Sequence, residues 1–477
     1  MKICDIIKGV AEFESDPCME INKIAYDSRK VEKNDMFVCI KGYQTDGHKY
    51  VEAAVNNGAA VIVAMDKIEC SVPVIYVKDS RMALALMSKN YFKAPLSGKS
   101  LIGITGTNGK TTVTYLIKTI CENQGKTLGL IGTNQNVIGD EIIPTERTTP
   151  ESNELYALFD HMVKKGADGV VMEVCSHALE LHRVGGCEFE CAVFTNLTQD
   201  HLDFHVTMEN YFKAKEKLFS MCKNAVINID DEYGKRIKPA CKAYSYGIEN
   251  DNAVLNGKNV KITAAGVDFD LVFEEKTYPV HLCIPGKFSV YNALAALGAA
   301  IAMGISPRAA TEALLKAQGV KGRAEIVPTN TDYTVLIDYA HTPDGLENII
   351  STVNEFKKGR VITLFGCGGD RDRTKRPVMG KCAGTLSDFV VVTSDNPRSE
   401  DPAAIIDDIM PGVIESGCEY VRIENRKDAI KWALENAQKD DIIVLAGKGH
   451  ETYQILNTGT IHFDEREVVA EVLASKE

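Results

Sequence analysis

Apolar segments of strand length alternate with amphipathic segments of helix length along most of this chain. From Ser100 onward the strand-like runs are LIGITG, TLGLIG, GVVMEV, CAVFTNL and NAVINID, and helical patterns separate most of them. Such alternation is typical of a parallel sheet with helices on both faces, because each parallel strand needs a crossover connection. We therefore expect an α/β fold, and a length of 477 residues allows about three domains.

Two changes of pattern divide the chain into expected domains at 1–98, 99–324 and 325–477. The first is a small mixed α/β domain, in which runs such as AAVIVAM and VPVIYV alternate with short helical patterns. The second is a parallel sheet with an antiparallel appendage, because one strand-like run follows another between Val260 and Ile284. The second domain ends with two expected helices, near Ser289–Met303 and Arg308–Ala317. The third resumes the alternation in VLIDYA, RVITLFGCG, FVVVTSD and DIIVLAGKG, and is expected to be Rossmann-like.

Composition narrows the classes of function. Lys and Arg total 54 against 66 Asp and Glu, and the net charge of -12 argues against general binding to nucleic acid or to an anionic membrane. The longest apolar run, around Ala293 to Ile305, is shorter than the ~20 residues of a membrane span. The beginning, MKICDIIKGV, lacks the pattern of a signal peptide. The 14 cysteines form no CxxC pair, so we expect reduced thiols and a cytoplasmic protein.

One glycine-rich segment follows a strand-like run and opens a helical one: Gly106-Thr107-Asn108-Gly109-Lys110-Thr111-Thr112. Glycines let backbone N–H groups close around phosphate oxygens, the lysine can reach the outer phosphates, and the first threonine hydroxyl can bind Mg²⁺. The usual GxxxxGK[ST] spacing would need a glycine at position 104, where Ile104 stands. The alternative is a chance glycine-rich turn, which the order strand, loop, helix disfavours. We therefore predict that this loop binds phosphate.

Polar residues after other strand-like runs are candidates for the same site. Glu173 ends GVVMEV, where a carboxylate near a phosphate loop would hold Mg²⁺, although a strand-end glutamate on its own is more often exposed. His201 with Asp203 could ligate or orient a metal, or anchor a loop. Further along, residue type alone predicts a solvated surface stripe of three lysines, Lys213, Lys215 and Lys217.

Four polar loops follow strand-like runs of the third domain: DYAHTP (338–343), FGCGGDRDR (365–373), SDNPR (394–398) and GKGHE (447–451). Because the carboxyl ends of parallel strands meet at one edge of a sheet, these loops predict a binding cleft. Its cations are Arg371 and Arg398, and its acids include Asp395 and Glu451. An arginine pairs with a carboxylate and an acid with an ammonium, so the cleft suits a small zwitterion.

Seven segments in this order resemble the Mur ligases of peptidoglycan synthesis: GTNGKTT, MEVCSHALELHRV, FTNLTQDHLD, DYAHTPD, FGCGGDRDRTKRP, SDNPRSEDP and GKGHE. The resemblance covers essentially the whole chain. It implies a UDP-binding first domain, a central ATPase and a Rossmann-like domain that brings the amino acid. It also implies a cytoplasmic, monomeric, ATP-dependent ligase that adds meso-diaminopimelate to UDP-MurNAc-L-Ala-D-Glu through an acyl phosphate.

The resemblance implies roles for individual residues as well. ATP is expected at Gly106 to Thr112, Asn292, Arg323 and Asp338. The expected ligands of Mg²⁺ are Thr111, Glu173, His201 and Lys215, the last as a carbamate formed with CO₂; the catalytic residues are Lys110 together with Glu173, His201 and Lys215. The UDP-MurNAc dipeptide is expected at Ser28, Thr148, Thr149, Cys175, Ser176 and Arg183. Diaminopimelate is expected at Arg371, Asp395, Asn396, Pro397, Arg398, Gly447 and Glu451.

The chain departs from the family pattern at Cys175, where a serine is expected before Ser176, and a thiol is a weaker hydrogen-bond partner than a hydroxyl. An L-lysine-adding relative is a second possibility, disfavoured because lysine has no distal carboxylate for Arg398 to bind. A folylpolyglutamate synthase is disfavoured by the additional N-terminal domain and by GKTT in place of GKGS. A catalytically silent nucleotide-binding module is disfavoured because Lys110, Glu173 and Lys215 are all present.

Overall fold

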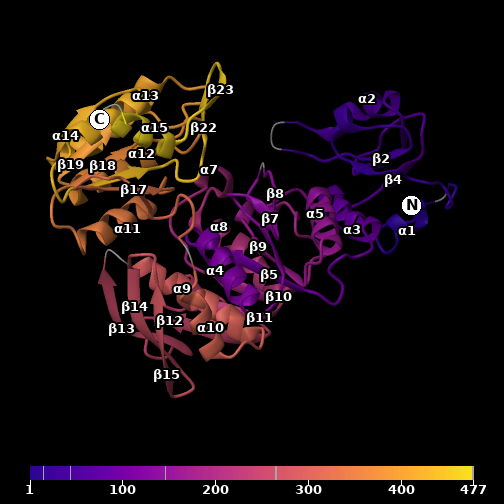
Figure 1. The fold of residues 1–477 in the computed structure, drawn as a ribbon. Coiled ribbons are helices and arrows are strands. Elements are labelled where there is room, and N and C mark those ends of the chain that lie inside the picture. Colours follow the sequence, from indigo (N-terminus) through magenta and orange to yellow (C-terminus); the bar gives the residue numbers. More distant parts are fainter. Residues whose placement is uncertain (14, 43–44, 146, 264–265, 318, 475–477) are drawn as a thin grey trace. The chain divides into compact units, whose positions relative to one another are not determined.

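The computed structural model describes residues 1–13, 15–42, 45–145, 147–263, 266–317 and 319–474 (Figure 1). The chain packs into two compact units. The first contains Met1–Thr105, Gly125–Ala192 and Ala214–Asn224, and the second contains Gly106–Gln124, Val193–Lys213 and Ala225–Glu477. The domain boundaries expected at 98 and 324 stay predictions. Among the described helices, none combines the length and the apolar character that a membrane crossing requires.

The first unit begins with four parallel strands in sequence order, β1 (Ile24–Ala25), β2 (Asp35–Val38), β3 (Ala59–Ala64) and β4 (Val74–Tyr76). Alternate residues of β3 belong to two separate buried clusters, because side chains of a strand point to opposite faces. One cluster contains α1 (Ile3–Ile6) and α3 (Ser80–Tyr91), and the other α2 (Val51–Asn56). Two short 3₁₀ turns, η1 (Ser28–Lys30) and η2 (Gly47–Tyr50), complete this part.

The same unit holds a second group of strands. β9 (Gly169–Glu173) lies between β5 (Ser100–Thr105) and β6 (Leu128–Ile131), and all three are parallel. The antiparallel hairpin of β7 (Asn136–Ile138) and β8 (Glu141–Ile143) continues from β6. The helices of this group are α5 (Ser152–Lys164) and α6 (Ser176–Glu180). Three further elements begin in one unit and end in the other: β10 (Phe189–Phe194), α8 (Met208–Glu216) and β11 (Cys222–Asn228). The turn η3 (Lys217–Ser220) lies between the last two.

The first part of the second unit contains α4 (Lys110–Glu122), which packs on α9 (Lys287–Ala302). Helix α9 is rich in alanine and buried around most of its circumference, as expected for a helix that is apolar on all faces. Strands β13 (Leu255–Thr263), β14 (Gly266–Phe273) and β15 (Lys276–Leu282) are antiparallel, and β12 (Lys242–Gly247) joins β13 in parallel (Figure 1). The predicted antiparallel appendage is therefore confirmed, as are the two helices after it, α9 and α10 (Pro307–Leu314). Two short elements, α7 (Leu202–His205) and η4 (Gly234–Arg236), also belong here.

The rest of the second unit is built on a six-stranded sheet in the order β16 (Glu325–Val327), β17 (Thr334–Asp338), β21 (Ile442–Ala446), β18 (Val361–Phe365), β19 (Phe389–Val392) and β20 (Glu419–Arg422). All strands but β16 are parallel. Its helices, seen around the sheet in Figure 1, are α11 (Pro343–Asn354), α12 (Lys375–Leu386), α13 (Pro402–Ser416), α14 (Arg426–Asn436) and α15 (Glu465–Ala474). An antiparallel hairpin, β22 (Tyr453–Leu456) and β23 (Gly459–His462), precedes α15. The expected α/β class is confirmed, and the loops after β17, β18, β19 and β21 share one edge of the sheet.

Candidate active site

The glycine-rich loop before α4 has a backbone conformation that requires its glycines. Gly106 and Gly109 have φ angles of 149° and 84°, which residues with side chains rarely adopt. A Cβ atom at Gly109 would lie 2.4 Å from Oδ1 of Asn292, and one at Gly106 would lie 1.9 Å from Oγ1 of Thr195. The loop leads directly into a helix of 13 residues, whose first N–H groups have no partner within the helix and favour an anion.

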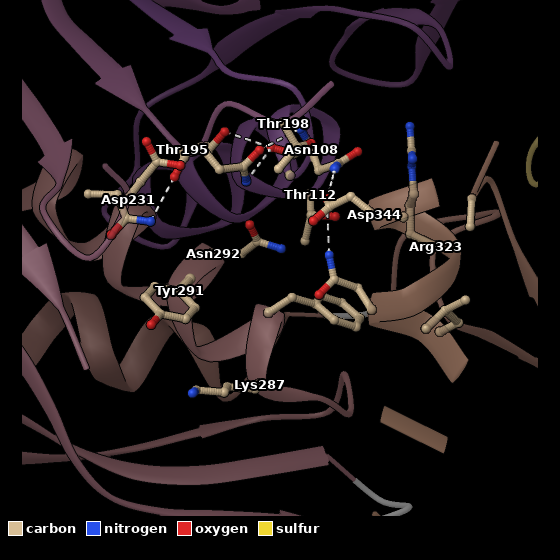
Figure 2. Close-up of a pocket in the computed structure, with 18 of the residues that line it drawn as sticks. Asn108, Thr112, Thr195, Thr198, Asp231, Lys287, Tyr291, Asn292, Arg323 and Asp344 are labelled. Atoms are coloured by element: carbon tan, nitrogen blue, oxygen red, sulfur yellow. Dashed lines mark hydrogen bonds between the residues drawn. The ribbon is translucent and has the colours of Figure 1, made fainter. Parts of the chain in front are cut away.

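Neighbouring segments of the second unit hold this loop in place. The backbone N–H of Asn108 donates to Oδ1 of Asn196 at 2.9 Å, and its carbonyl accepts a hydrogen bond from Oγ1 of Thr195 at 2.6 Å. The side-chain amide of Asn108 donates to Asp344 (Figure 2). Nζ of Lys110 donates to two carbonyl oxygens of the loop, at 2.8 and 3.0 Å, so the ammonium lies across it. The loop is thus ordered by its surroundings, which is what a preformed phosphate site requires.

A cavity of about 430 Å³ lies beside the loop, within the second unit. Asn292 reaches into it from α9, and Tyr291 and Lys287 lie further along the same helix (Figure 2). Arg323 donates from Nη2 to Oγ1 of Thr111 at 3.1 Å, and its guanidinium lies 4.7 Å from the centre of the Tyr339 ring. The cavity brings together seven of the residues predicted for ATP: Asn108, Gly109, Thr111, Thr112, Asn292, Arg323 and Asp338.

Asp338 joins two segments that line the cavity. One oxygen of its carboxylate accepts from the N–H of Ala324 at 2.7 Å and the other from the N–H of Ala340 at 2.8 Å. Several further lining residues were not among the predicted ones, namely Thr195, Asn196, Tyr339 and Asp344. All four belong to the quoted motifs, but the linear motif does not tell which of its positions contacts the loop.

His201 lies beside Asp200, its neighbour in the chain. Its Nε2 lies 3.4 Å from Oδ2 of Asp200, whereas Asp203 is exposed. Burial of Asp200 disfavours its charged form, but the electrostatic effect of His201, His341 and Lys375 prevails and lowers the pKa of Asp200 to about 2. An ionised Asp200 is therefore available to orient the imidazole of His201 at neutral pH.

In the first unit, Glu173 lies next to predicted substrate residues. It ends β9 and is only 1% exposed, so it is not the exposed strand-end glutamate that residue type alone favours. One carboxylate oxygen of Glu173 accepts from the backbone N–H of Thr133 at 2.9 Å, and the other accepts from the Thr133 hydroxyl at 3.0 Å. The Thr133 hydroxyl is also 3.0 Å from the hydroxyl of Thr148. Thr149 donates from Oγ1 to the carbonyl of Glu173 at 2.8 Å and accepts from the N–H of Cys175 at 3.1 Å. This contact of Cys175 is made by its backbone N–H.

Arg183 belongs to the same neighbourhood. It donates from Nη1 to the carbonyl of Thr149 at 3.1 Å, and its Nε lies 2.9 Å from a carboxylate oxygen of Glu151. Glu151 is shared with Arg81, at 3.6 Å, a residue that lies in none of the quoted motifs. Of the other predicted substrate residues, Ser176 begins α6 and is buried. Ser28 begins η1, and its carbonyl accepts a hydrogen bond at 2.9 Å from Asn57.

The three lysines of α8 and η3 do not form one surface stripe. Lys213 and Lys217 are exposed, and Lys217 pairs with Glu180 at 2.6 Å. Lys215 is only 1% exposed. The prediction from residue type is therefore wrong for Lys215, because helical spacing turns it to the opposite side from its two neighbours.

The residues predicted for the amino-acid cleft lie on loops of the C-terminal sheet. Nδ2 of Asn396, after β19, donates to Oε2 of Glu451, after β21, at 2.8 Å. Asp395 lies close to Gly447, where a Cβ atom would be 2.5 Å from Oδ2 of Asp395. Burial raises the pKa of Glu451 above its usual value. The two predicted acids therefore come together at the sheet edge, with Asn396 fixed between their loops.

The predicted arginines lie beside the loop after β18. Nη1 of Arg398 donates to the carbonyl of Gly369 at 2.8 Å, and a Cβ atom at Gly368 would be 2.8 Å from the same nitrogen and 3.8 Å from Cγ of Arg371. Pro397 packs closely on the same loop, because its carbonyl oxygen would lie 1.9 Å from a Cβ atom at Gly369. Arg371 is exposed. Both cations thus lie near Gly368, and their role in binding a carboxylate stays a prediction.

Among the described residues, one group of metal-ligating side chains outside these sites comes close together, namely Asp46, His48 and Asp66. Nδ1 of His48 lies 2.6 Å from Asp46, and its Nε2 accepts a hydrogen bond from the N–H of Met65 at 3.1 Å. Both imidazole nitrogens are therefore used within the fold, and the group serves to connect loops of the first unit.

The chain is similar to known proteins along its whole length. Three family models match: "Mur ligase family, catalytic domain" at residues 20–92, "Mur ligase middle domain" at 104–300 and "Mur ligase, glutamate ligase domain" at 322–449. Relatives from Caldanaerobacter subterraneus subsp. tengcongensis and Clostridium botulinum are each 52% identical, over 100% and 95% of both chains. Both are named UDP-N-acetylmuramoyl-L-alanyl-D-glutamate--2,6-diaminopimelate ligase.

A solved structure of a protein with that name is 33% identical and has a TM-score of 0.72, covering 100% of this chain and 99% of the other. The match extends over all three parts of the chain, and the resemblance inferred from the motifs is confirmed. The chain belongs to the Mur ligase family.

Proposed function

We propose that this protein is an ATP-dependent ligase that adds meso-diaminopimelate to UDP-MurNAc-L-Ala-D-Glu during peptidoglycan precursor synthesis, as a cytoplasmic monomer. The observation that carries the choice of amino acid is the cleft in which Arg398 borders one loop and Asp395 and Glu451 lie together. Diaminopimelate offers two carboxylates and two ammonium groups to such a set of charges. The names of the 52% identical relatives support the same substrate.

The proposed reaction proceeds in two transfers. The D-Glu carboxylate attacks the γ-phosphorus of ATP, the bond to ADP breaks, and an acyl phosphate forms. The amine of diaminopimelate then attacks the acyl carbon and phosphate leaves. The amide bond forms, and the nitrogen releases one proton. The glycine-rich loop and Lys110 position and neutralise the phosphates, which is the main contribution a protein makes to phosphoryl transfer. Asn292 and Arg323 bind the nucleotide in the cavity beside the loop.

The donor groups suit Mg²⁺, which prefers oxygen ligands and binds ATP phosphates. The proposed ligands are Thr111 and His201 of the second unit and Glu173 and Lys215 of the first, and the ion would neutralise phosphate charge. Two observations support the fit. Thr133 orients both oxygens of Glu173, and Lys215 lies inside the fold and not on the surface. Carbamylation by CO₂ converts the Lys215 amine into an oxygen ligand.

The substrate dipeptide is assigned to the first unit, at Ser28, Thr148, Thr149, Cys175, Ser176 and Arg183. The hydrogen bonds that connect Thr149 with Arg183 and with the end of β9 support a single binding surface for most of them. The two arginines that share Glu151 add positive charge there, which suits a ligand that carries a diphosphate and carboxylates.

Phosphate release by the purified protein tests the proposal. We expect release only when ATP, Mg²⁺, UDP-MurNAc-L-Ala-D-Glu and meso-diaminopimelate are all present, with one phosphate for each amide formed. Leaving out each component in turn is the control. Release that does not need the dipeptide substrate would contradict the ligase reaction, and no release with any amino acid would support a silent nucleotide-binding module instead.

A further inference from the structure

Lys448 is a fully buried lysine beneath the amino-acid cleft. It follows β21, its relative exposure is 0%, and Nζ lies 2.9 Å from Oε2 of Glu451 and 3.2 Å from Oδ1 of Asn396. The ammonium is also 5.8 Å from the centre of the Tyr453 ring. A buried ammonium is retained only when such partners compensate the loss of water, so the three polar groups form one unit.

The contacts of Asn396 fix the direction of that unit. Its Oδ1 accepts from the N–H of Ile455 at 2.9 Å as well as from Lys448, so its Nδ2 must face Glu451. Oε2 of Glu451 then accepts from both Asn396 and Lys448. In the described part of the chain no protein hydrogen bond reaches Oε1 of Glu451, so this oxygen is left for a ligand.

We propose that Lys448 is a positioning residue for the incoming amino acid: it holds Glu451 ionised and oriented, so that Oε1 can accept from the ammonium of that amino acid. The inference rests on the proposed function, because it takes the cleft to be the amino-acid site. Lys448 itself is covered by its partners and does not touch the substrate. Its role is to favour the charged form of the glutamate in a place where burial opposes it.

The electrostatic surroundings of Glu451 support this role. Burial raises the pKa of Glu451, the charge of Asp395 raises it further, and Lys448 lowers it. Glu451 also interacts with the phenols of Tyr339 and Tyr453, whose pKa values are raised by burial. Lys448 therefore favours the charged form of Glu451, and its removal shifts the pKa of Glu451 upward.

The test compares Lys448→Met with Lys381→Met, which removes a lysine from an exposed ion pair with Glu415 on the same domain. We expect kcat/KM for diaminopimelate to fall about 10- to 100-fold in Lys448→Met, the size of a lost charge-assisted hydrogen bond. KM for ATP and for the dipeptide substrate stays within about twofold, and the acid limb of the kcat/KM profile moves to higher pH. Lys381→Met changes none of these.

Two further variants make the test independent of folding. Lys448→Gln keeps a donor without the charge and should lie between wild type and Lys448→Met in kcat/KM, with the same shift of the acid limb. In a Glu451→Gln background, Lys448→Met should cause less than about threefold additional loss, because residues that act through one another are not additive. Equal losses for all three substrates, an unmoved acid limb, or full additivity with Glu451→Gln would overturn the proposal. If the wild-type protein uses another amino acid, that amino acid replaces diaminopimelate in every measurement. The choice of diaminopimelate and the role of Lys448 can therefore be refuted independently of each other.

Discussion

Replacing Gly109 by alanine tests whether Asn292 helps to form the ATP site. The new Cβ atom would lie 2.4 Å from Oδ1 of Asn292, and ordinary contact begins at 3.4 Å, so the amide must move by about 1 Å. The φ angle of 84° adds backbone strain of about 1–2 kcal/mol. Gly125→Ala is the matched control, since Gly125 has a φ of 75° and nothing within 4 Å of its Cβ position.

Both variants therefore carry similar strain, and only Gly109→Ala displaces Asn292. Loss of one hydrogen bond to the nucleotide costs about 1 kcal/mol of binding free energy. The new Cβ atom in the loop increases this cost, so we expect KM for ATP to rise about tenfold. The assay is phosphate release against ATP concentration, with thermal stabilisation by an ATP analogue as an independent measure of binding. In an Asn292→Ala background the effect of Gly109→Ala should become much smaller. The same KM for ATP in both glycine variants would refute the role given to Asn292.

Three other predictions concern the buried lysine Lys215, the choice of amino acid by Arg398, and the effect of Glu400 on stability. Lys215→Ala should abolish ligation while an ATP analogue still binds, and a small added carboxylate should restore part of the activity; substantial activity without that addition would argue against the carbamate. Arg398→Ala should reduce the preference for diaminopimelate over L-lysine about 10- to 100-fold, measured as the ratio of kcat/KM values, and an unchanged ratio would remove this role. Hydrogen bonds from Arg376 lower the pKa of Glu400 to about 2. A carboxyl group whose pKa is lower in the folded state stabilises the protein at pH values above the pKa of the unfolded state. That stabilisation is lost as the pH falls through the pKa of the folded state. Urea unfolding should therefore show stability that falls between about pH 5 and pH 2 in wild type, and less so in Glu400→Gln; parallel curves would contradict this.

The parts of the fold that follow from local pattern were predictable from the sequence. Strand–helix alternation gave the parallel sheets, and consecutive strands between Val260 and Ile284 gave the antiparallel appendage. The glycine-rich loop before α4 was predictable because its glycines and the start of the helix lie within one short segment. These features depend on residues near each other in the chain, so the sequence pattern alone predicts them.

Other features depend on neighbours distant in sequence, and the pattern alone could not give them. The burial of Lys215 follows from what packs on its side of α8, and residue type pointed the other way. His201 lies 3.4 Å from Asp200, a contact that the DHLD string does not single out. The pairing of Glu173 with Thr133 joins segments 40 residues apart, and Lys448 lies in a quoted motif without any sign that it is buried.

We propose that this ligase selects meso-diaminopimelate. The most direct measurement offers the enzyme equal concentrations of meso-diaminopimelate and L-lysine, with ATP, Mg²⁺ and UDP-MurNAc-L-Ala-D-Glu, and determines the masses of the products. We expect the product that contains diaminopimelate almost alone, because lysine has no distal carboxylate for Arg398 to bind. A predominant lysine product would contradict the assignment of the cleft while leaving the ligase reaction in place.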